Sequence, residues 1–255
     1  MMLTPHKSMA KKRVDQLLVE RGLAQSRSRA QAYIMAGNVY SGEKKILKSG
    51  QQVKEDIALE VRGKEHPWVS RGGLKLMQGL EEFGIDVTDM TVIDVGASTG
   101  GFTDVCLTRG AKKVYAVDVG HGQLAWKIRN DPRVVVFEKT NARYLSEEQI
   151  ADKVNLIVCD ASFIGLQTVL PAAMKLAADG CILVALIKPQ FEVGKGKVGK
   201  GGVVREPELH TEVCDKIKNW ITEDMEKWNV IGLTQSPIKG PEGNIEFLIG
   251  ARYEP

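Results

Sequence analysis

The chain of 255 residues has no apolar run near the roughly 18 residues that a membrane-spanning helix needs. Its first residues carry charge but no apolar core of a secretory signal, so we expect a cytoplasmic protein. The four cysteines include no Cys-x-x-Cys pair, which disfavours a disulfide framework or a zinc site and favours buried thiols. Internal repeats and low-complexity tracts are missing as well. With 43% hydrophobic residues, the chain has the composition of a globular protein with a core.

Positive charge is concentrated at one end of the chain. Residues 1–64 hold 13 Lys and Arg against 6 Asp and Glu, whereas the other 191 residues hold 22 against 26. A net charge of +7 on a small module is typical of a polyanion-binding surface. A basic face that serves only solubility remains the alternative.

The basic module has the pattern of two helices followed by short strands. Val14, Leu17 and Leu18 repeat at helical spacing before Gly22, and Ser26 can cap a second helix that ends near Gly37. The motifs Arg13-Val-Asp-Gln-Leu-Leu, Gly22-Leu-Ala-Gln-Ser-Arg, Arg29-Ala and Ile34-x-x-Gly-Asn-Val resemble the ribosomal-protein type of small RNA-binding domain, the alpha-L motif. By that resemblance the second helix and the following turn contact phosphates, which positions an RNA without reading its sequence. The RNA-binding residues that we expect are Arg13, Arg27, Arg29, Lys44, Lys45 and Lys48.

The segment 91–103 predicts a nucleoside-cofactor site. A β-branched strand ends on an acid and enters a small-residue turn, Asp94-Val-Gly-Ala-Ser-Thr-Gly-Gly, before a helix. Glycine lets the backbone approach a ligand, and the first amides of the helix face the same cleft. A second strand ends on Asp118, which can accept hydrogen bonds from ribose hydroxyls.

The spacing favours one cofactor over others. The dinucleotide fingerprint Gly-x-Gly-x-x-Gly is not met, and Asp94 before the turn would repel a pyrophosphate but suits a cationic group. We therefore expect S-adenosylmethionine. A nicotinamide or flavin site and a ligand-free turn are the alternatives.

From Gly73 onward, helical and strand patterns alternate, which predicts a parallel α/β sheet that closes with an antiparallel pair. This is the layout of Rossmann-like methyltransferases. Strands are expected near 91–95, 113–117, 134–138, 154–159, 181–187, 228–234 and 245–252, and helices near 101–109, 122–130, 166–178 and 207–225. The domain prediction is disorder over 1–11, an α+β RNA-binding domain over 12–63, a linker over 64–72 and a methyltransferase domain over 73–255.

Four charged residues fall where this fold could bring them together. Asp160 and Lys188 directly follow apolar strands, Glu246 lies in an otherwise apolar final strand, and Lys75 sits in the helix before the sheet. Ligands in such sheets bind outside the carboxyl ends of the strands. A lysine there can orient a weakly acidic hydroxyl or accept its proton during methyl transfer. Ordinary ion pairs are the alternative interpretation.

The four residues resemble the Lys-Asp-Lys-Glu tetrad of FtsJ-like ribose 2′-O-methyltransferases. Trp68-Val-Ser-Arg-Gly-Gly-Leu-Lys, Asp118-Val-Gly-His-Gly-Gln-Leu, Ile187-Lys-Pro-Gln-Phe-Glu and Ser236-Pro-Ile-Lys-Gly-Pro-Glu-Gly-Asn are similar to the haemolysin A (TlyA) family. The resemblance implies methylation of cytidine 2′-hydroxyls in ribosomal RNA, on one ribosomal subunit or both. It also implies a donor pocket, in which Asp118 holds the ribose, Asn141 reaches the adenine and Asp160 lies nearest the sulfonium. The expected donor residues are Asp94, Gly96, Ser98, Thr99, Gly100, Phe102, Thr103, Asp118, Asn141 and Asp160.

Rival functions remain distinct from this one. They are an RNA-binding assembly factor without catalysis, a membrane-active haemolysin and an NAD-dependent enzyme. The segment 194–202 resembles the phosphate-binding loop motif, but Gly201 occupies the position where that motif requires Ser or Thr. We therefore expect a basic loop near the site, which either contacts RNA or is simply solvated. The four histidines form no ligand set, the four tryptophans are expected in the core, and no metal is expected. We expect a monomer that acts on ribosomal RNA or ribosomal subunits.

Overall fold

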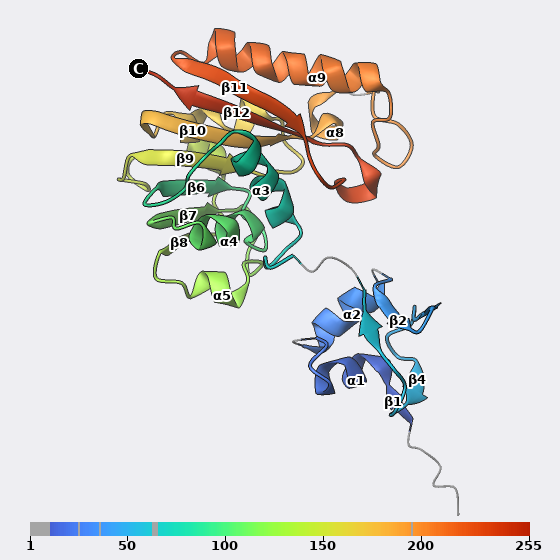
Figure 1. Ribbon diagram of the computed structural model, residues 1–255. Coiled ribbons are helices and arrows are strands. Elements are labelled where there is room, and N and C mark those ends of the chain that lie inside the picture. The colour runs from blue at the N-terminus through green and yellow to red at the C-terminus, as the bar shows by residue number, and fades with distance from the viewer. Residues whose placement is uncertain (1–10, 25, 36, 63–65, 195) are drawn as a thin grey trace, which may run out of the picture. The chain divides into compact units, whose positions relative to one another are not determined.

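The computed structural model describes residues 11–24, 26–35, 37–62, 66–194 and 196–255. Contacts divide the chain into two compact units, Met1–Glu65 and His66–Pro255 (Figure 1). The expected disorder over 1–11 falls outside the described residues except for Lys11, which is in a strand. The described part of the expected linker, from His66 onward, belongs to the larger unit.

The smaller unit packs two helices on short strands. Helices α1 (Val14–Glu20) and α2 (Arg27–Met35) enclose a core in which Leu18 and Ile34 are fully buried. The Ser26 hydroxyl accepts a hydrogen bond from the Arg29 amide at 3.2 Å, so the predicted cap of α2 is confirmed. The strands are β1 (Lys11–Arg13) paired with β4 (Gln52–Lys54), and β2 (Val39–Ser41) between β3 (Lys44–Lys45) and β5 (Glu60–Val61).

The larger unit is built on a seven-stranded sheet, as predicted. Its spatial order is β11-β12-β10-β9-β6-β7-β8, and β12 alone runs antiparallel to the other strands in it (Figure 1). The strands are β6 (Thr91–Val95), β7 (Lys113–Val117), β8 (Val134–Phe137), β9 (Val154–Cys159), β10 (Ala177–Ile187), β11 (Trp228–Gln235) and β12 (Phe247–Tyr253).

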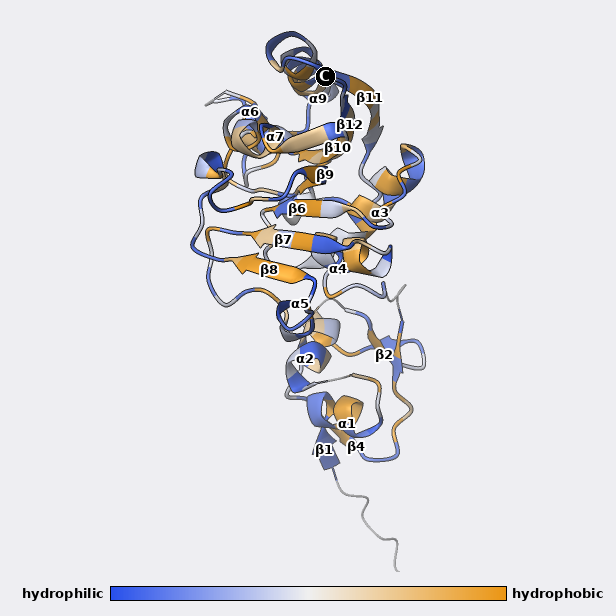
Figure 2. Cartoon of the chain, turned by 90° about the vertical axis from the view of Figure 1, so that its left-hand side faces the viewer, coloured by the Kyte–Doolittle hydropathy of each residue, from blue (hydrophilic) through white to orange (hydrophobic). Residues whose placement is uncertain are grey.

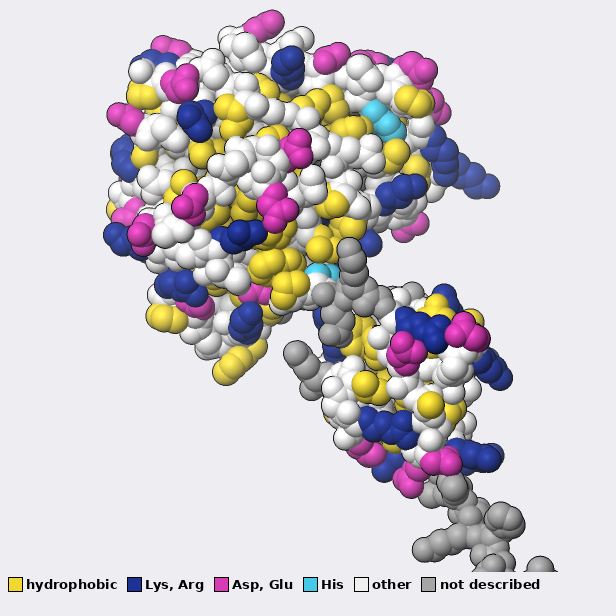
Figure 3. Space-filling model, viewed as in Figure 1, with side chains coloured by type: hydrophobic (Ala, Val, Ile, Leu, Met, Phe, Trp, Pro, Cys, Tyr) yellow, Lys and Arg dark blue, Asp and Glu magenta, His cyan; other side chains and the backbone are white. Residues whose placement is uncertain are grey.

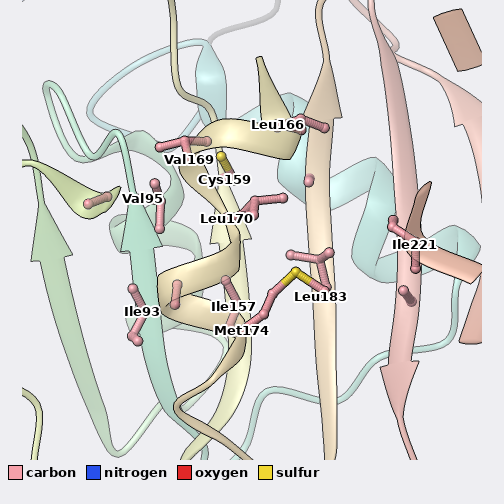
Figure 4. Packing of buried hydrophobic residues seen from close by; sticks show 14 of the residues in the cluster. Ile93, Val95, Ile157, Cys159, Leu166, Val169, Leu170, Met174, Leu183 and Ile221 are labelled. Carbon is pink, nitrogen blue, oxygen red and sulfur yellow. The ribbon is translucent and has the colours of Figure 1, made fainter. Parts of the chain in front are cut away.

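Helices cover both faces of this sheet, because the inner strands are mostly apolar and bury residues on both sides (Figure 2). Alternate residues of β10 divide between two cores: Leu183 belongs to one and Val184 to the other. The first core lies under α6 (Leu166–Val169), α7 (Pro171–Met174) and α9 (Pro207–Asn219), and Figure 4 shows Met174 beside Leu183. The second lies under α3 (Gly72–Glu82), α4 (Gly101–Thr108) and α5 (Trp126–Arg129).

Three predicted helices are shorter than expected. The helix predicted over 122–130 forms only at α5. The helix predicted over 166–178 breaks at Pro171, because proline has no backbone N–H to continue the hydrogen bonding of the preceding helix. Pro171 instead becomes the first residue of α7, and β10 begins already at Ala177. The helix predicted over 207–225 is α-helical only over α9 and continues directly as a π-helix, η2 (Trp220–Asp224).

One tryptophan departs from the expected core. Trp220 and Trp228 are buried and Trp68 packs against the second core, but Trp126 is 80% exposed. It begins α5, and that helix is anchored through the fully buried Ile128 instead. All four cysteines are free and buried, as predicted. None of the described helices is both long and apolar enough to cross a bilayer.

Candidate active site

The carboxyl edge of the sheet brings the four predicted charged residues together. Asp160 follows β9 and Lys188 follows β10. Glu246 immediately precedes β12, and the reversed direction of that strand pairs Phe247 with Ile187. A residue at the start of the last strand therefore lies beside a residue at the end of a parallel one.

The four side chains form a chain of alternating charges. Lys188 Nζ lies 2.6 Å from Asp160 Oδ1, Lys75 Nζ lies 3.8 Å from Asp160 Oδ2, and Lys75 Nζ lies 2.7 Å from Glu246 Oε2. Both lysine side chains are less than a tenth exposed and that of Glu246 is fully buried, whereas the Asp160 side chain is 22% exposed. Asp160 is thus the member of the tetrad most open to a ligand.

Two further contacts hold this arrangement. Lys188 Nζ donates to the Ser162 hydroxyl at 2.8 Å and to the Asp160 carbonyl at 3.2 Å, so the loop after β9 fixes the lysine from two sides. Gly240 lies against the Glu246 carboxylate so closely that a Cβ there would overlap Oε1. The loop after β11 therefore closes over Glu246 only because residue 240 has no side chain.

The tetrad opens into a cavity of about 260 Å³. Three of its members line this cavity, together with the first turns of α3 and α4. Arg71 lies on its wall one helical turn before Lys75, is exposed, and forms no ion pair in the described part of the chain. The lining residues are Ser70, Arg71, Gly72, Lys75, Gly96, Ala97, Ser98, Thr99, Gly101, Phe102, Asp160, Ser162 and Lys188.

A larger cavity of about 740 Å³ adjoins the first, and Gly96, Ser98, Asp160 and Ser162 line both. Its volume lies within the range of about 300–1,000 Å³ that is usual for small-molecule sites. Gly96 has a φ of +81°, and a Cβ there would lie 2.9 Å from the Ala161 backbone. The predicted glycine turn is therefore required both by its backbone conformation and by the close approach of the loop after β9.

The larger cavity also contains the two residues expected at the nucleoside end. Asp118 Oδ2 accepts from the Ser98 amide at 2.8 Å and Oδ1 from the Gly120 amide at 2.7 Å, which orients the carboxylate. Asn141 Oδ1 accepts from the Arg143 amide at 3.1 Å and caps the short helix η1 (Ala142–Tyr144). The Asn141 amide nitrogen has no hydrogen-bond partner within the described residues, so it can donate into the cavity that the residue lines.

Asp94, Gly100 and Thr103 line neither cavity. Asp94 is fully buried, and the Thr103 hydroxyl donates to its Oδ2 at 2.6 Å. Burial raises the pKa of Asp94 to about 7, with the nearby Asp160 and Asp118 carboxylates acting in the same direction. Asp94 therefore lies beneath the glycine turn and not on the cavity wall.

Sequence reasoning missed several residues on the cavity walls. Ser162 and Phe163 follow Asp160 in the same strand-end loop, so the rule that located Asp160 could have included them. Arg71 has the weaker signal of a cation one turn before Lys75. Phe163 is 89% exposed with a φ of +64°, which no sequence pattern indicated.

In the smaller unit, a buried carboxylate organises two of the predicted RNA-binding residues. Asp15 is fully buried and accepts hydrogen bonds from Arg13 at 2.8 and 3.0 Å, from Arg27 at 3.0 Å and from Gln31 at 3.0 Å. These bonds, above all those from Arg13, lower the pKa of Asp15 well below its usual range. Arg13 and Arg27 are thereby held side by side with their outer faces in solvent.

Of the other predicted basic residues, Arg29 lies on α2, Lys44 and Lys45 form β3, and Lys48 follows that strand. Arg29 lies over the Tyr33 ring at 5.3 Å, and Lys45 lies over the Tyr40 ring at 5.5 Å. Lys44, Lys45 and Lys48 are exposed. Cation–π contacts of this kind hold the positive charges over the rings. Across the described residues, no group of three His, Cys, Asp or Glu is arranged to hold a metal ion.

Comparison with known proteins agrees with this geometry. The FtsJ-like methyltransferase family model matches residues 68–253, and the S4 domain model matches residues 12–56. The 16S/23S rRNA (cytidine-2′-O)-methyltransferase TlyA of Mycobacterium tuberculosis is 49% identical over 95% of this chain and 90% of its own. Hemolysin A of Brachyspira hyodysenteriae is 42% identical over 92% of this chain and 98% of its own.

A solved structure extends the similarity to the fold. A Streptococcus thermophilus protein of the hemolysin group is 42% identical, covers 97% of this chain and 90% of its own, and superposes with a TM-score of 0.75. Together with the two family matches, this places an S4 domain and a methyltransferase domain in one chain. The chain therefore belongs to the TlyA/haemolysin A family of FtsJ-like methyltransferases, as its motifs predicted.

Proposed function

We propose that this enzyme transfers the methyl group of S-adenosylmethionine to the 2′-hydroxyl of a cytidine in ribosomal RNA. The observation that carries the proposal is the Lys75–Asp160–Lys188–Glu246 tetrad in a cavity that shares Asp160 with a second, nucleoside-sized cavity. One cavity suits a donor and the other an acceptor, and the shared wall is where a group could pass between them.

The larger cavity fits the donor. Asp118 would accept from the ribose hydroxyls, Asn141 would reach the adenine, and Gly96 to Thr99 would approach the amino-acid end with backbone atoms. Asp160, on the shared wall, offers a negative charge for the sulfonium. When bound, the donor supplies an electrophilic methyl group.

The tetrad supplies the acid–base chemistry. The ribose hydroxyl must lose its proton as its oxygen bonds to the methyl carbon. We assign Lys188 to accept that proton, because Asp160 at 2.6 Å can stabilise the ammonium that results. Lys75 pairs with Glu246 and also lies near the second carboxylate oxygen of Asp160. We assign Lys75 to hold the Asp160 carboxylate in its orientation.

The substrate follows from the rest of the chain and from its relatives. The smaller unit offers a cationic surface, Arg13, Arg27, Arg29, Lys44, Lys45 and Lys48, suited to RNA phosphates. The name of the Mycobacterium relative specifies cytidine 2′-hydroxyls of 16S and 23S rRNA, and we extend that specificity to this chain. Such an enzyme would work in the cytoplasm, where ribosomes are assembled.

The test is methyl transfer from a tritiated donor to purified ribosomal subunits, followed by nuclease digestion. We expect label on the ribose of cytidine. Label on a base, or donor binding without transfer to any ribosomal RNA, would contradict the proposal and favour a non-catalytic assembly factor.

A further inference from the structure

The connection between α8 (Pro189–Glu192) and α9 contains a segment that the chemistry above does not use. We call residues 196–205 the lysine loop. Gly199 N donates to Val203 O at 3.1 Å and Gly202 N donates to Gly199 O at 3.1 Å, so the segment folds into a closed turn. In Figure 1 it lies beside the connection between β11 and β12.

Asn244 attaches the lysine loop to the tetrad. Its Oδ1 accepts from the Val204 amide at 3.1 Å, and its Nδ2 donates to the Gly202 carbonyl at 2.9 Å. Asn244 is only 2% exposed and stands two residues before Glu246. Buried amides that satisfy backbone groups in this way hold a loop in one place.

A second buried polar group holds the other side of the loop. His210, from α9, lies 3.0 Å through Nε2 from the Val204 carbonyl and is 7% exposed. On the Asn244 side, the Gly240 amide donates to the Asn244 carbonyl at 2.9 Å while Gly240 itself packs on the Glu246 carboxylate. Hydrogen bonds therefore hold the middle of the lysine loop in place relative to Glu246, in addition to the covalent connections at the two ends of the loop.

The exposed surface of this region is cationic. The lysine loop contains Lys197, Lys200 and Arg205 and no acid, and Lys239 is exposed on the neighbouring β11–β12 connection. Lys197 is paired with Glu212 at 2.7 Å, but Lys200 and Lys239 have no ion pair among the described residues. Figure 3 shows basic side chains projecting at the edge where Figure 1 draws the loop. Lys200 and Lys239 thus lie on the two segments that contact Asn244 and Glu246.

We propose that the lysine loop and Lys239 form a second RNA-contact surface, which binds backbone phosphates of nucleotides adjacent to the one that enters the tetrad cavity. The inference rests on the proposed function. A ribose held at the tetrad carries a phosphate on each side, so a polyanionic strand must leave the cavity across its rim. Cations on segments that are held next to Glu246 would set the register of the strand and select RNA over a free nucleoside.

The experiment compares two matched double variants. Lys200→Ala/Lys239→Ala removes the two unpaired cations, and Lys175→Ala/Lys218→Ala removes two exposed lysines elsewhere on the same unit. Binding of the full chain to a ribosomal RNA fragment is measured over a range of salt concentrations. Each lost phosphate contact should reduce the slope of log K against log salt by roughly 0.7 to 0.9.

We expect the first variant to bind RNA at least about tenfold more weakly in 0.1 M salt, with a slope reduced by roughly 1 to 2, and to keep its donor affinity. The control should match the parent chain. Equal slopes for the two double variants would overturn the inference. Failure of the parent chain to methylate any ribose is a separate outcome, which would defeat the proposed function instead.

Discussion

Lys75 Nζ and Glu246 Oε2 lie 2.7 Å apart in the folded chain although 171 positions separate them in the sequence. Their side chains are 6% and 0% exposed. A buried ion pair costs nearly as much in desolvation as it returns in attraction, so it adds little to net stability. What the pair does add is a fixed ammonium directed at Asp160, which is the role that we assign to it.

Removing one partner of this pair should therefore damage both folding and catalysis. Glu246→Leu leaves the Lys75 ammonium buried without its carboxylate, and we expect the free energy of unfolding to fall by about 3–5 kcal/mol. The double variant Lys75→Met/Glu246→Leu replaces the pair with apolar side chains and should recover most of that loss. Chemical denaturation measures the stability, and methyl transfer should remain low in both. A double variant that is stable and fully active would show that the pair has no catalytic role.

Loss of the Lys188 side chain should slow the methyl-transfer step and leave the affinities for donor and RNA nearly unchanged. Lys188→Ala should lower the single-turnover rate by roughly 10²–10⁴, the range for a lost general acid–base group. Lys188→Arg should not rescue the rate, because a guanidinium does not give up its proton at working pH. Donor affinity by calorimetry and RNA affinity serve as controls and should be nearly unchanged. A near-normal rate for Lys188→Ala would exclude it as the proton acceptor.

Much of this site could be predicted because strand ends are readable in sequence. Asp160 and Lys188 each follow an apolar run, and parallel strands bring their carboxyl ends to one edge. Glu246 could be placed there only through the expected reversal of the last strand. Lys75 could be placed only in the helix before the sheet, because nothing local in a helix shows which strand end it will face.

What could not be predicted depends on tertiary contact. Asp94 was expected in the donor pocket, but the packing of α4 through Thr103 buries it completely. Tryptophan is a large apolar residue that is expected in a core, yet α5 is only four residues long and leaves Trp126 exposed to solvent. The attachment of the lysine loop by Asn244 requires two segments that approach only in the fold.

A side chain at Gly96 should abolish donor binding. Gly96→Val places a Cβ about 2.9 Å from the Ala161 backbone, at a φ of +81° that valine strongly disfavours, on the wall that both cavities share. We expect donor affinity to fall by more than about 100-fold, the scale of about 3 kcal/mol. Gly84→Val is the matched control, since Gly84 also has a positive φ but has open space around it. Comparable loss of donor affinity in both variants would indicate general strain and not occlusion of the site.

The protonation of Asp94 should make stability depend on pH. Because its folded-state pKa is raised to about 7 from the ordinary aspartate value of 3.8, the folded chain keeps a proton that the unfolded chain releases. This contribution to stability is fully present below about pH 4 and is lost as the pH rises through about 7, at up to about 1.4 kcal/mol per pH unit. Asp94→Asn cannot release that proton. Its free energy of unfolding, relative to the parent chain, should therefore increase from pH 4.5 to 7.5 in donor-free denaturation. Parallel curves would mean that Asp94 is ionised throughout.

Three exposed lysines of the smaller unit, on β3 and just after it, should govern RNA affinity without affecting the rate of methyl transfer. Lys44, Lys45 and Lys48 are exposed, so a triple Lys→Ala variant removes charge without leaving a cavity. Released counterions drive such contacts, and the slope of log K against log salt should fall by roughly 2 to 3 for three lost phosphate contacts. Lys11→Ala/Lys54→Ala is the control, because these two exposed lysines are opposite each other in the β1–β4 register. Both lie outside segment 44–48 of the sequence. Donor affinity should stay unchanged in both variants, and at saturating RNA the transfer rate should approach that of the parent chain. A triple variant with normal salt dependence would place the RNA surface of this unit elsewhere, and one with a reduced rate at saturating RNA would mean that these lysines also position the reacting ribose.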